Sequence, residues 1–351
     1  MTVTVEKNKF LNAIKAVKSS VSKVALQPAL STIHLKSENG GLTLTATDLD
    51  TTARAICEAN STEPIEVCIN ANALESIVAS LSDLITLDIN EAKVIIKSGN
   101  TKYQVLYIQS SEFPQVDFDL TGNKVVVGKD EFINCANKAV ISTSTDNGVL
   151  SGVCFTNNEF AATDGNRLSI IPFITPLNVE GQYIIPRRIL LDVIRNVGGD
   201  VTMYLQDKSV IFQTGTCLFK QNLLVGKFPA YQQLLPTEFS QIAIVDKEEL
   251  LHSLERVSVM CDDRAPITIF DFNNGELHLT TACEDGKAED TIEVSFDGEL
   301  KIAFNYRFML EGLKVMQEDA IEFNMNTEVS ACIINGGYTY LLMPIQLRGN
   351  K

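Results

Sequence analysis

The sequence lacks the short motifs that mark several common classes of enzyme. Its eight cysteines are scattered without a C-x-x-C pair, so we expect reduced cytosolic thiols. Its three histidines, His34, His252 and His278, show no metal-ligand spacing, which argues against a zinc site. It contains no P-loop, no H-E-x-x-H motif and no nucleophile elbow. These absences disfavour an enzyme, and we expect no cofactor and no metal.

Targeting segments are missing as well. The N-terminus has no charged region followed by an apolar run, and no apolar stretch approaches the length of a membrane span. We therefore expect a cytoplasmic protein that makes no contact with a membrane. The 351 residues are too many for one ordinary core, and a hydrophobic content of 45% is ample for two or three domains.

One pattern occurs three times along the chain. It begins with an alternating strand that leads into a helix, at Thr2–Lys7, Lys124–Lys129 and Ile242–Lys247. Apolar residues follow at helical spacing. These residues are Phe10, Ile14 and Val17; Phe132, Ala136 and Ala139; and Leu250, Leu254 and Val257.

A second helix and a closing hairpin repeat with the same period. The second helices begin at Asn70, Pro186 and Asn305, which are 116 and 119 residues apart. The hairpins cover residues 94–106, 210–222 and 331–343. A period this long indicates a triplicated domain, and we predict domains at 1–121, 122–240 and 241–351. Each copy has two helices and mostly antiparallel strands, which predicts an α+β fold with helices on one face of a sheet.

A third repeated feature lies at the centre of each copy. The stretch A-A-T-D-G-N-R-L at Ala161–Leu168 has fainter counterparts at Thr45–Asp50 and Thr280–Asp285. Asp164-Gly165 is typical of a turn between strands, where an aspartate accepts hydrogen bonds from backbone N–H groups.

Charge is distributed unevenly between the predicted helices and the remaining chain. The six helices, predicted at 6–23, 70–82, 129–141, 186–197, 246–259 and 305–317, carry 14 basic and 10 acidic residues. The remaining chain carries 15 basic and 34 acidic residues, and the whole has a net charge of −15. This distribution indicates that the helices form a surface that binds a polyanion and that the exterior is acidic. Ordinary solvated helix faces would also explain an excess of four basic residues on the helices. The candidates for sequence-independent phosphate contact are Lys7, Lys9, Lys15, Lys18, Lys23, Arg187, Arg188 and Arg195.

Together, these features resemble those of the bacterial DNA polymerase III beta subunit, or beta sliding clamp, family. The resemblance rests on the three copies, A-T-D-G-N-R-L, F-P-A-Y-Q-Q-L-L-P at Phe228–Pro236 and Y-L-L-M-P-I-Q-L at Tyr340–Leu347. It implies a DNA clamp fold in which two subunits close head-to-tail into a homodimeric ring of six domains. It also implies a non-catalytic processivity factor that encircles double-stranded DNA and needs no cofactor.

The resemblance implies a second site as well, a pocket between the second and third copies for short linear motifs. Its partners would be the polymerase III alpha subunit, the clamp loader, other polymerases and repair proteins. The wall would comprise Leu150, Thr163, Gly165, Asn166, Arg167, Leu168, Pro229, Leu234, Asn305, Phe308, Leu341, Leu342, Met343, Pro344, Ile345 and Leu347. The sequence departs from the family pattern at Asn166, often histidine, at Gln346, often basic, and in the terminal segment Arg348–Lys351.

The residue types of this pocket suit such a role without the family. We expect Leu341, Met343, Ile345 and Leu347 to point one way along a strand that Pro344 confines to a sheet edge. Methionine and leucine make an adaptable apolar floor, and Arg167 could offer a fixed donor fork. A buried terminal strand that seals the third copy is the alternative.

Two other functions are weighed against the clamp. Asp48 and Asp164 with Asp262 and Asp263 could hold Mg²⁺ for phosphoryl chemistry, but the third copy has Cys283 where the aspartates stand. A scaffold that binds peptides without encircling DNA is the second rival. Convergence of basic residues from all three helix pairs on one surface would distinguish the clamp from that scaffold.

Overall fold

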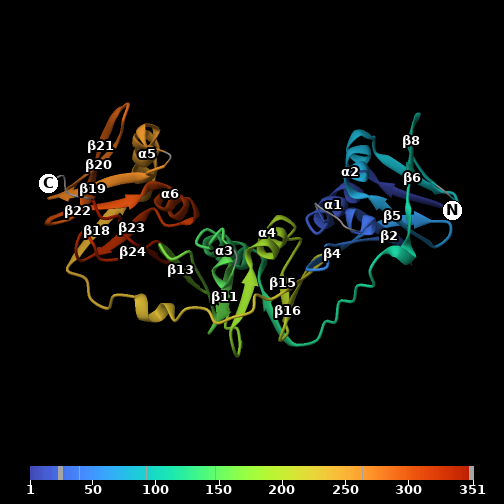
Figure 1. Cartoon of the computed structure of the whole chain (residues 1–351), viewed down its shortest axis with the longest axis horizontal. Coiled ribbons are helices and arrows are strands. Elements are labelled where there is room, and N and C mark those ends of the chain that lie inside the picture. The colour runs from blue at the N-terminus through green and yellow to red at the C-terminus, as the bar shows by residue number, and fades with distance from the viewer. Residues whose placement is uncertain (23–26, 39, 92, 147, 263, 348–351) are drawn as a thin grey trace. The chain divides into compact units, whose positions relative to one another are not determined.

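The computed structural model describes residues 1–22, 27–38, 40–91, 93–146, 148–262 and 264–347. Lys23, Asp263 and the terminal segment Arg348–Lys351 therefore lie outside the described residues. The chain forms two compact units, one of residues 1–132 with 188–223 and the other of residues 133–187 with 224–351. Each unit contains one extended antiparallel sheet (Figure 1).

The first unit contains a thirteen-stranded sheet. Its strands are β1 (Thr2–Glu6), β2 (Thr32–Glu38), β3 (Gly41–Thr47), β4 (Thr51–Ser61), β5 (Ile65–Asn70), β6 (Leu84–Ile89), β7 (Lys93–Ser98), β8 (Thr101–Leu106), β9 (Ile108–Gln109), β10 (Asn123–Val127), β15 (Val201–Leu205), β16 (Ser209–Thr214) and β17 (Cys217–Asn222).

The second unit contains a twelve-stranded sheet. Its strands are β11 (Gly152–Thr156), β12 (Glu159–Thr163), β13 (Arg167–Pro172), β14 (Tyr183–Pro186), β18 (Gln241–Asp246), β19 (Ile267–Asn273), β20 (Glu276–Cys283), β21 (Gly286–Ser295), β22 (Glu299–Asn305), β23 (Ala320–Met325), β24 (Cys332–Asn335) and β25 (Thr339–Leu342).

The helices occur in pairs, two for each copy, as the sequence predicts. They are α1 (Lys7–Lys18), α2 (Ala71–Ser80), α3 (Lys129–Val140), α4 (Arg187–Arg195), α5 (Lys247–Val257) and α6 (Tyr306–Val315). The apolar residues predicted to face the core are all at most 1% exposed, from Phe10 in α1 to Val257 in α5. The N-caps predicted at Asn70 and Asn305 are also confirmed, because each side-chain oxygen accepts a backbone N–H of its helix.

The first helix is shorter than predicted. The sequence predicts a helix over 6–23, but α1 ends at Lys18. The N–H groups of Ser20 and Val21 bond three residues back, to the carbonyl groups of Val17 and Lys18, so the last turn tightens and stops. Ser22 then donates its N–H to the Leu30 carbonyl and leaves the helix axis.

Each copy contains two four-stranded groups that a closing segment connects. In the first copy the groups are β1-β6-β7-β8 and β4-β3-β2-β5, and the later copies repeat this order. After the last strand of the first group, the chain crosses to the edge strand of the second. Ile108 pairs with Cys68, Leu224 donates its N–H to the Ile184 carbonyl, and Ile345 donates to Ala303. The segment after the last hairpin is therefore held in the same way in all three copies.

Candidate functional site

The turn between β12 and β13 is organised by two side chains. Asp164 Oδ1 accepts the N–H groups of Asn166 and Arg167 at 2.9 and 3.1 Å, and Thr163 Oγ1 accepts the N–H of Gly165 at 3.1 Å. Gly165 has a φ of +93°, and a Cβ there would meet nothing within 4 Å. Asp164 therefore shapes backbone, as predicted, and Gly165 leaves the space above the turn open.

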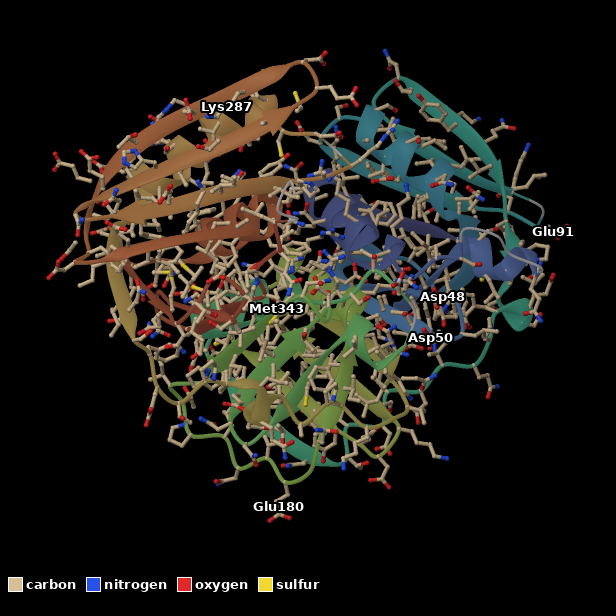
Figure 2. The ribbon with its side chains drawn as sticks, turned by 60° about the vertical axis from the view of Figure 1, so that its left-hand side comes forward. Asp48, Asp50, Glu91, Glu180, Lys287 and Met343 are labelled. Atoms are coloured by element: carbon tan, nitrogen blue, oxygen red, sulfur yellow. The ribbon has the colours of Figure 1, made fainter. Side chains whose placement is uncertain are left out.

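Asp48 organises the turn between β3 and β4 in the same way. Its Oδ1 accepts the N–H groups of Asp50 and Thr51 at 3.2 and 2.7 Å (both aspartates are labelled in Figure 2). Over the described part of the chain, no group of three or more His, Cys, Asp or Glu side chains could hold a metal ion. The Mg²⁺ hypothesis also named Asp263, which lies outside that part.

Arg167 is buried, and its guanidinium is held by partners within the chain. It is 7% exposed, and its Nε and Nη1 donate to Asp164 Oδ2 at 2.9 Å and to Glu311 Oε2 at 2.6 Å. Its guanidinium carbon lies 4.1 Å from the centroid of the Phe308 ring. Burial alone would lower the pKa of Arg167, but Tyr340 and Glu311 outweigh it and raise the pKa above its ordinary value. The guanidinium is therefore fixed in place, and intramolecular acceptors engage two of its nitrogens, while its contact with a partner peptide stays a prediction.

An apolar cluster lies beneath this turn. Leu168 on β13 is opposite Leu341 on β25, and both side chains are almost fully buried. Leu150 packs against the same cluster. The other members include Cys154, Ala161, Ile170, Ile184, Phe228, Tyr231 and Ile333. Burial raises the pKa of Cys154 to about 12, so this thiol stays neutral and behaves as a small apolar side chain.

The C-terminal segment differs from the prediction. The strand β25 ends at Leu342, and β25 lies inside the sheet between β13 and β24. The expected edge strand through Leu347 is therefore wrong, because the chain leaves the sheet and Pro344 has no N–H to continue a ladder. Met343 donates its N–H to the Asn166 carbonyl at 2.9 Å, and Ile345 donates to Ala303 at 2.8 Å.

These two bonds hold the segment between the β12–β13 turn and β22. Leu341 and Leu342 are buried, whereas Met343, which is labelled in Figure 2, is 45% exposed. The side chains do not alternate between two faces as predicted. The predicted apolar floor of the pocket consists instead of buried leucines and an exposed methionine.

The remaining predicted residues are not members of the cluster. Pro229 and Leu234 are exposed on either side of Tyr231, which belongs to the cluster. Phe308 is half-buried under Arg167, and Asn305 caps α6 through its side-chain oxygen. Leu347 is 47% exposed beyond the last backbone bond.

Two residues of this site were missed by the sequence reasoning. Glu311 pairs with Arg167, and Tyr340 donates its hydroxyl to the Phe308 carbonyl at 2.8 Å. Glu311 follows Phe308 by three residues on one helix, so helical spacing could have placed both on one face. Nothing in the sequence indicates the partner of Tyr340.

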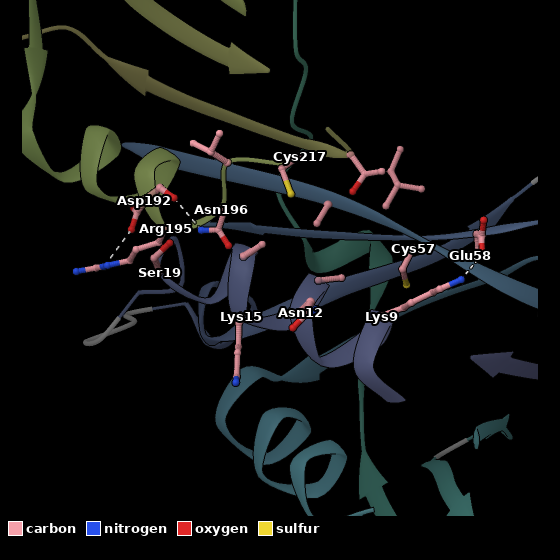
Figure 3. A pocket seen from close by; sticks show the side chains of 16 residues that line it. Lys9, Asn12, Lys15, Ser19, Cys57, Glu58, Asp192, Arg195, Asn196 and Cys217 are labelled. Atoms are coloured by element: carbon pink, nitrogen blue, oxygen red, sulfur yellow. Dashed lines mark hydrogen bonds and ion pairs between the residues drawn. The ribbon is translucent and has the colours of Figure 1, made fainter. Parts of the chain in front are cut away.

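The basic residues predicted to face DNA gather in part on one groove in the first unit. Lys9 and Lys15 on α1 and Arg195 on α4 line a groove of about 820 Å³ (Figure 3). Its other side is formed by β4, by Thr216 and by Cys217, the first residue of β17. In Figure 3, Lys9 reaches along the groove toward Glu58, and Arg195 extends from the far end near Asp192.

Most of these cations already have acidic partners. Lys9 pairs with Glu58, Lys18 with Glu75, and Arg188 with Asp48 at 2.7 Å. Arg195 is 67% exposed and lies 3.7 Å from Asp192 Oδ1. Lys7 and Arg187 lie at the first positions of α1 and α4, while Lys15 is exposed. Phosphate contact by the paired residues would require the exchange of a carboxylate for a phosphate, and that role stays a prediction.

Comparison with known proteins identifies the family. Family models for the N-terminal, central and C-terminal domains of the DNA polymerase III beta subunit match residues 1–117, 126–230 and 232–346. The chain belongs to the DNA polymerase III beta subunit family. It is 30% identical to the beta sliding clamp of Synechococcus elongatus, covering 99% of this chain and 100% of that protein. It is 26% identical to the beta sliding clamp of Caulobacter vibrioides, with 99% and 100% covered.

Solved structures of this family share the fold. A DnaN sliding clamp from Bartonella birtlesii, bound to griselimycin, matches with a TM-score of 0.92 at 26% identity over 99% of this chain and 100% of that one. A beta subunit from Thermotoga maritima matches in fold with a TM-score of 0.90 at 24% identity, with the same coverage. The chain thus consists of three tandem clamp domains, as predicted. None of the helices in the described ranges is both long and apolar enough to span a membrane.

Proposed function

We propose that this chain is a DNA sliding clamp, in which two copies close head-to-tail into a ring around duplex DNA. The ring is a non-catalytic processivity factor of the cytoplasm. It holds the polymerase III alpha subunit, the clamp loader and repair proteins through linear motifs. Domain boundaries at 1–121, 122–240 and 241–351 belong to the same proposal.

One repeated strand pairing carries this proposal. The last hairpin strand of the second copy, β17, pairs with β4 of the first, and β25 of the third copy pairs with β13 of the second. In both pairings an aromatic residue faces a small one. Phe219 lies opposite Ala53, and Tyr340 lies opposite Ser169.

This pairing between successive copies leaves one strand of the first copy and one strand of the third copy without an equivalent partner. The strand β8 corresponds to β17 and β25, and it pairs with β7 alone among the described strands. The strand β21 corresponds to β4 and β13, and residues 286–293 pair with β20 on one side only within the described sheet. Two such unlike edges favour a head-to-tail contact between copies, and a pair of such contacts closes a ring.

The repeat also predicts the register of that contact. If β8 of one copy meets β21 of another as β17 meets β4, Tyr103 faces Ala288 and Lys102 faces Glu289. The aromatic-to-small pairing is kept, and the two exposed charges are opposite. Both observations support a heterologous interface over pairing of two β8 edges.

The groove of Lys9, Lys15 and Arg195 supports contact with DNA through phosphates. Weak, water-mediated and salt-sensitive contacts let a duplex slide, while the ring retains it by topology. The cluster of Leu168 and Leu341 under exposed Met343 supports a peptide site. A tethered polymerase would then rebind at a high effective concentration.

Retention on DNA tests the ring. The protein is loaded by a clamp loader with ATP onto a nicked circular plasmid, washed in high salt, and the plasmid is then cut once. Release only after cutting is the expected result. Loss during the salt wash, with loading verified, would contradict encirclement and favour the peptide-binding scaffold.

A matched pair of variants tests the interface itself. Ala288→Arg places a long side chain against Tyr103 in the predicted register and should yield monomers by analytical ultracentrifugation. Ala282→Arg, an exposed change on β20, serves as the control and should stay dimeric. Dimers of both variants would refute the β8–β21 contact.

A further inference from the structure

Helix α3 carries a lysine that is almost fully buried. Lys138 is 2% exposed, and its Nζ lies 5.2 Å from the centroid of the Tyr338 ring. It makes no ion pair and no hydrogen bond with the residues that the structure describes. Burial lowers the pKa of Lys138, an effect that the charge of Glu318 only partly opposes. A buried charge without a carboxylate in contact lowers the stability of a fold.

The other two copies have no buried cation at this position. Lys138 lies 122 residues after Ala16 and 118 residues before Arg256, the same spacings as between the first residues of α1, α3 and α5. Ala16 is 3% exposed, so a small apolar residue meets the packing requirement in the first copy. Arg256 is exposed and pairs with Asp290 in the third. The fold of the repeated domain therefore does not require a buried cation here.

The ring beneath Lys138 begins a series of contacts that ends at the predicted peptide site. Tyr338 lies against Tyr340, with ring centroids 5.8 Å apart and planes inclined by 41°. The Tyr340 hydroxyl donates to the Phe308 carbonyl at 2.8 Å, and the Phe308 ring lies 4.1 Å from the guanidinium carbon of Arg167. Phe308 and Arg167 are both predicted walls of the peptide site, so Lys138 is linked to that site without touching it.

Tyr340 determines where the first turn of α6 lies. Its ring packs directly on the helix, because a Cβ at Gly312 would lie 2.4 Å from Tyr340 Cε1. Only a glycine allows so close an approach of the ring to the helix backbone. The hydroxyl of the same ring then bonds to the Phe308 carbonyl. A change in the orientation of Tyr340 would therefore move Phe308 and the guanidinium stacked on it.

The corresponding place between the first two copies lacks this series of contacts. The residues at the positions of Tyr338, Phe308 and Arg167 are Cys217, Ile189 and Thr51. None of these three side chains has an aromatic ring or a charge. Ala16 and Cys217 instead line the open groove described above, where Lys138 and Tyr338 fill the equivalent space. The buried lysine thus accompanies the apolar peptide surface, which the first two copies do not form between them.

We propose, on the basis of the peptide site proposed above, that Lys138 is a positioning residue of that site. A cation over an aromatic face is attracted to it most strongly where water is excluded. The ammonium group therefore fixes the Tyr338 ring, and this ring supports Tyr340 and through it Phe308. Lys138 makes no contact with the partner peptide itself.

The variant Lys138→Met separates a positioning role from a role in folding. Methionine has a similar length and no charge, so the melting temperature should equal or exceed that of wild type. The affinity for a fluorescein-labelled peptide with the clamp-binding segment of a polymerase III alpha subunit should nevertheless fall by about threefold to tenfold. Fluorescence anisotropy with the full-length protein measures this affinity. Lys129→Met, at an exposed lysine of the same helix, is the control and should bind as wild type.

Two changes at the ring complete the test. Tyr338→Phe keeps the ring and removes a hydroxyl that is buried without a hydrogen-bond partner among the described residues, so its affinity should match wild type. Tyr338→Leu removes the ring and should weaken binding as Lys138→Met does. The double variant should bind no more weakly than Tyr338→Leu alone, because the cation acts through the ring. The carbonyl carbon signal of Phe308 in NMR, which reports on its bond from Tyr340, should shift in Lys138→Met.

Three outcomes would overturn the proposal. Unchanged affinity in folded Lys138→Met, with wild type binding the peptide, would show that the lysine does not act on the site. A fall in affinity together with a lower melting temperature would show a role in folding alone. Additive losses in the double variant would show that the lysine and the ring act separately. Absence of binding by wild type would instead contradict the proposed peptide site, on which the role of Lys138 rests.

Discussion

The two strand junctions of this chain share a backbone plan and differ in chemistry. At β4–β17 the two cross-strand pairs nearest the β3–β4 turn are polar, with Thr51 opposite Gln221 and Thr52 opposite Lys220. At β13–β25 the corresponding pairs are Arg167 opposite Leu342 and Leu168 opposite Leu341.

The two turns differ in the same sense. Arg188, 42% exposed, bonds to Asp48 at the first junction, while Asp50 accepts bonds from Gln221 and Asn222. At the second, a buried arginine stacks on Phe308, and Met343 stays exposed above buried leucines. The backbone thus joins domains at both places, but only the second has the apolar surface that a peptide motif needs.

Removing the two arginines should give the largest contrast. Arg167→Ala leaves Asp164 and Glu311 without their partner, and we expect a loss of about 3–5 kcal/mol in unfolding free energy. Arg188→Ala breaks a pair that water screens, and should cost about 1 kcal/mol or less. Calorimetry of both variants measures the difference. Equal losses would mean that burial does not distinguish the junctions.

Met343→Ala should weaken a clamp-binding peptide by about tenfold, because an exposed methionine gives up apolar contact area. Fluorescence anisotropy measures this affinity. The double variant with Leu168→Ala would bind more weakly still, but Leu168 is 1% exposed and its loss also destabilises the core. Ile242→Ala, on an exposed strand position of the third copy, is the control. Unchanged affinity in Met343→Ala would contradict the peptide site.

The turn glycine offers a smaller effect. Gly165→Ala places a Cβ at a φ of +93°, which should cost roughly 1–2 kcal/mol although nothing lies within 4 Å of it. The first junction already has Leu49 at a φ of +76°, so Leu49→Gly should relieve strain there. Urea unfolding measures both. A stabilising Gly165→Ala would mean that the turn tolerates side chains equally in both copies.

The smallest expected effect concerns pH. Burial lowers the pKa of His34 below its ordinary value of 6.5, against the opposing effect of Glu66. The folded state therefore binds this proton less readily than the unfolded state. The stabilising contribution is full above pH 6.5 and is lost as the pH falls from there through the folded pKa. Urea unfolding between pH 5 and 8 should show this slope in the wild type and a weaker one in His34→Gln.

Much of the fold could be predicted because the copies repeat in sequence. Helical spacing placed Phe10, Ile14 and Val17 on the buried face of α1, and turn chemistry assigned Asp164 its backbone bonds. Both signals are local, so a single stretch of residues contains them. The end of α1 was predicted less well, because Ser19 and Ser20 form a tighter turn that periodicity does not reveal.

The candidate site could be predicted only in part. The sequence pointed to Leu168, Arg167 and Met343 as neighbours, and β13–β25 pairing with the Met343–Asn166 bond brings them together. It could not show that Glu311 accepts a hydrogen bond from Arg167, since the two residues are 144 positions apart. The sequence also predicted a strand through Leu347, because apolar residues continue to alternate along the sequence after β25 has ended at Leu342.

By itself, then, the sequence determined the triplication, the family and the two-helix plan of each copy, because periodicity and motifs are properties of order along the chain. Tertiary structure alone decided which charges are free and which residues are exposed. Arg167 and Arg54 are the same residue type, but their surroundings differ. The guanidinium of Arg167 donates to two carboxylates, whereas the buried Nε of Arg54 has no acceptor among the described residues. That difference arises from packing between distant segments, where the neighbours of a side chain set the cost of burying its charge.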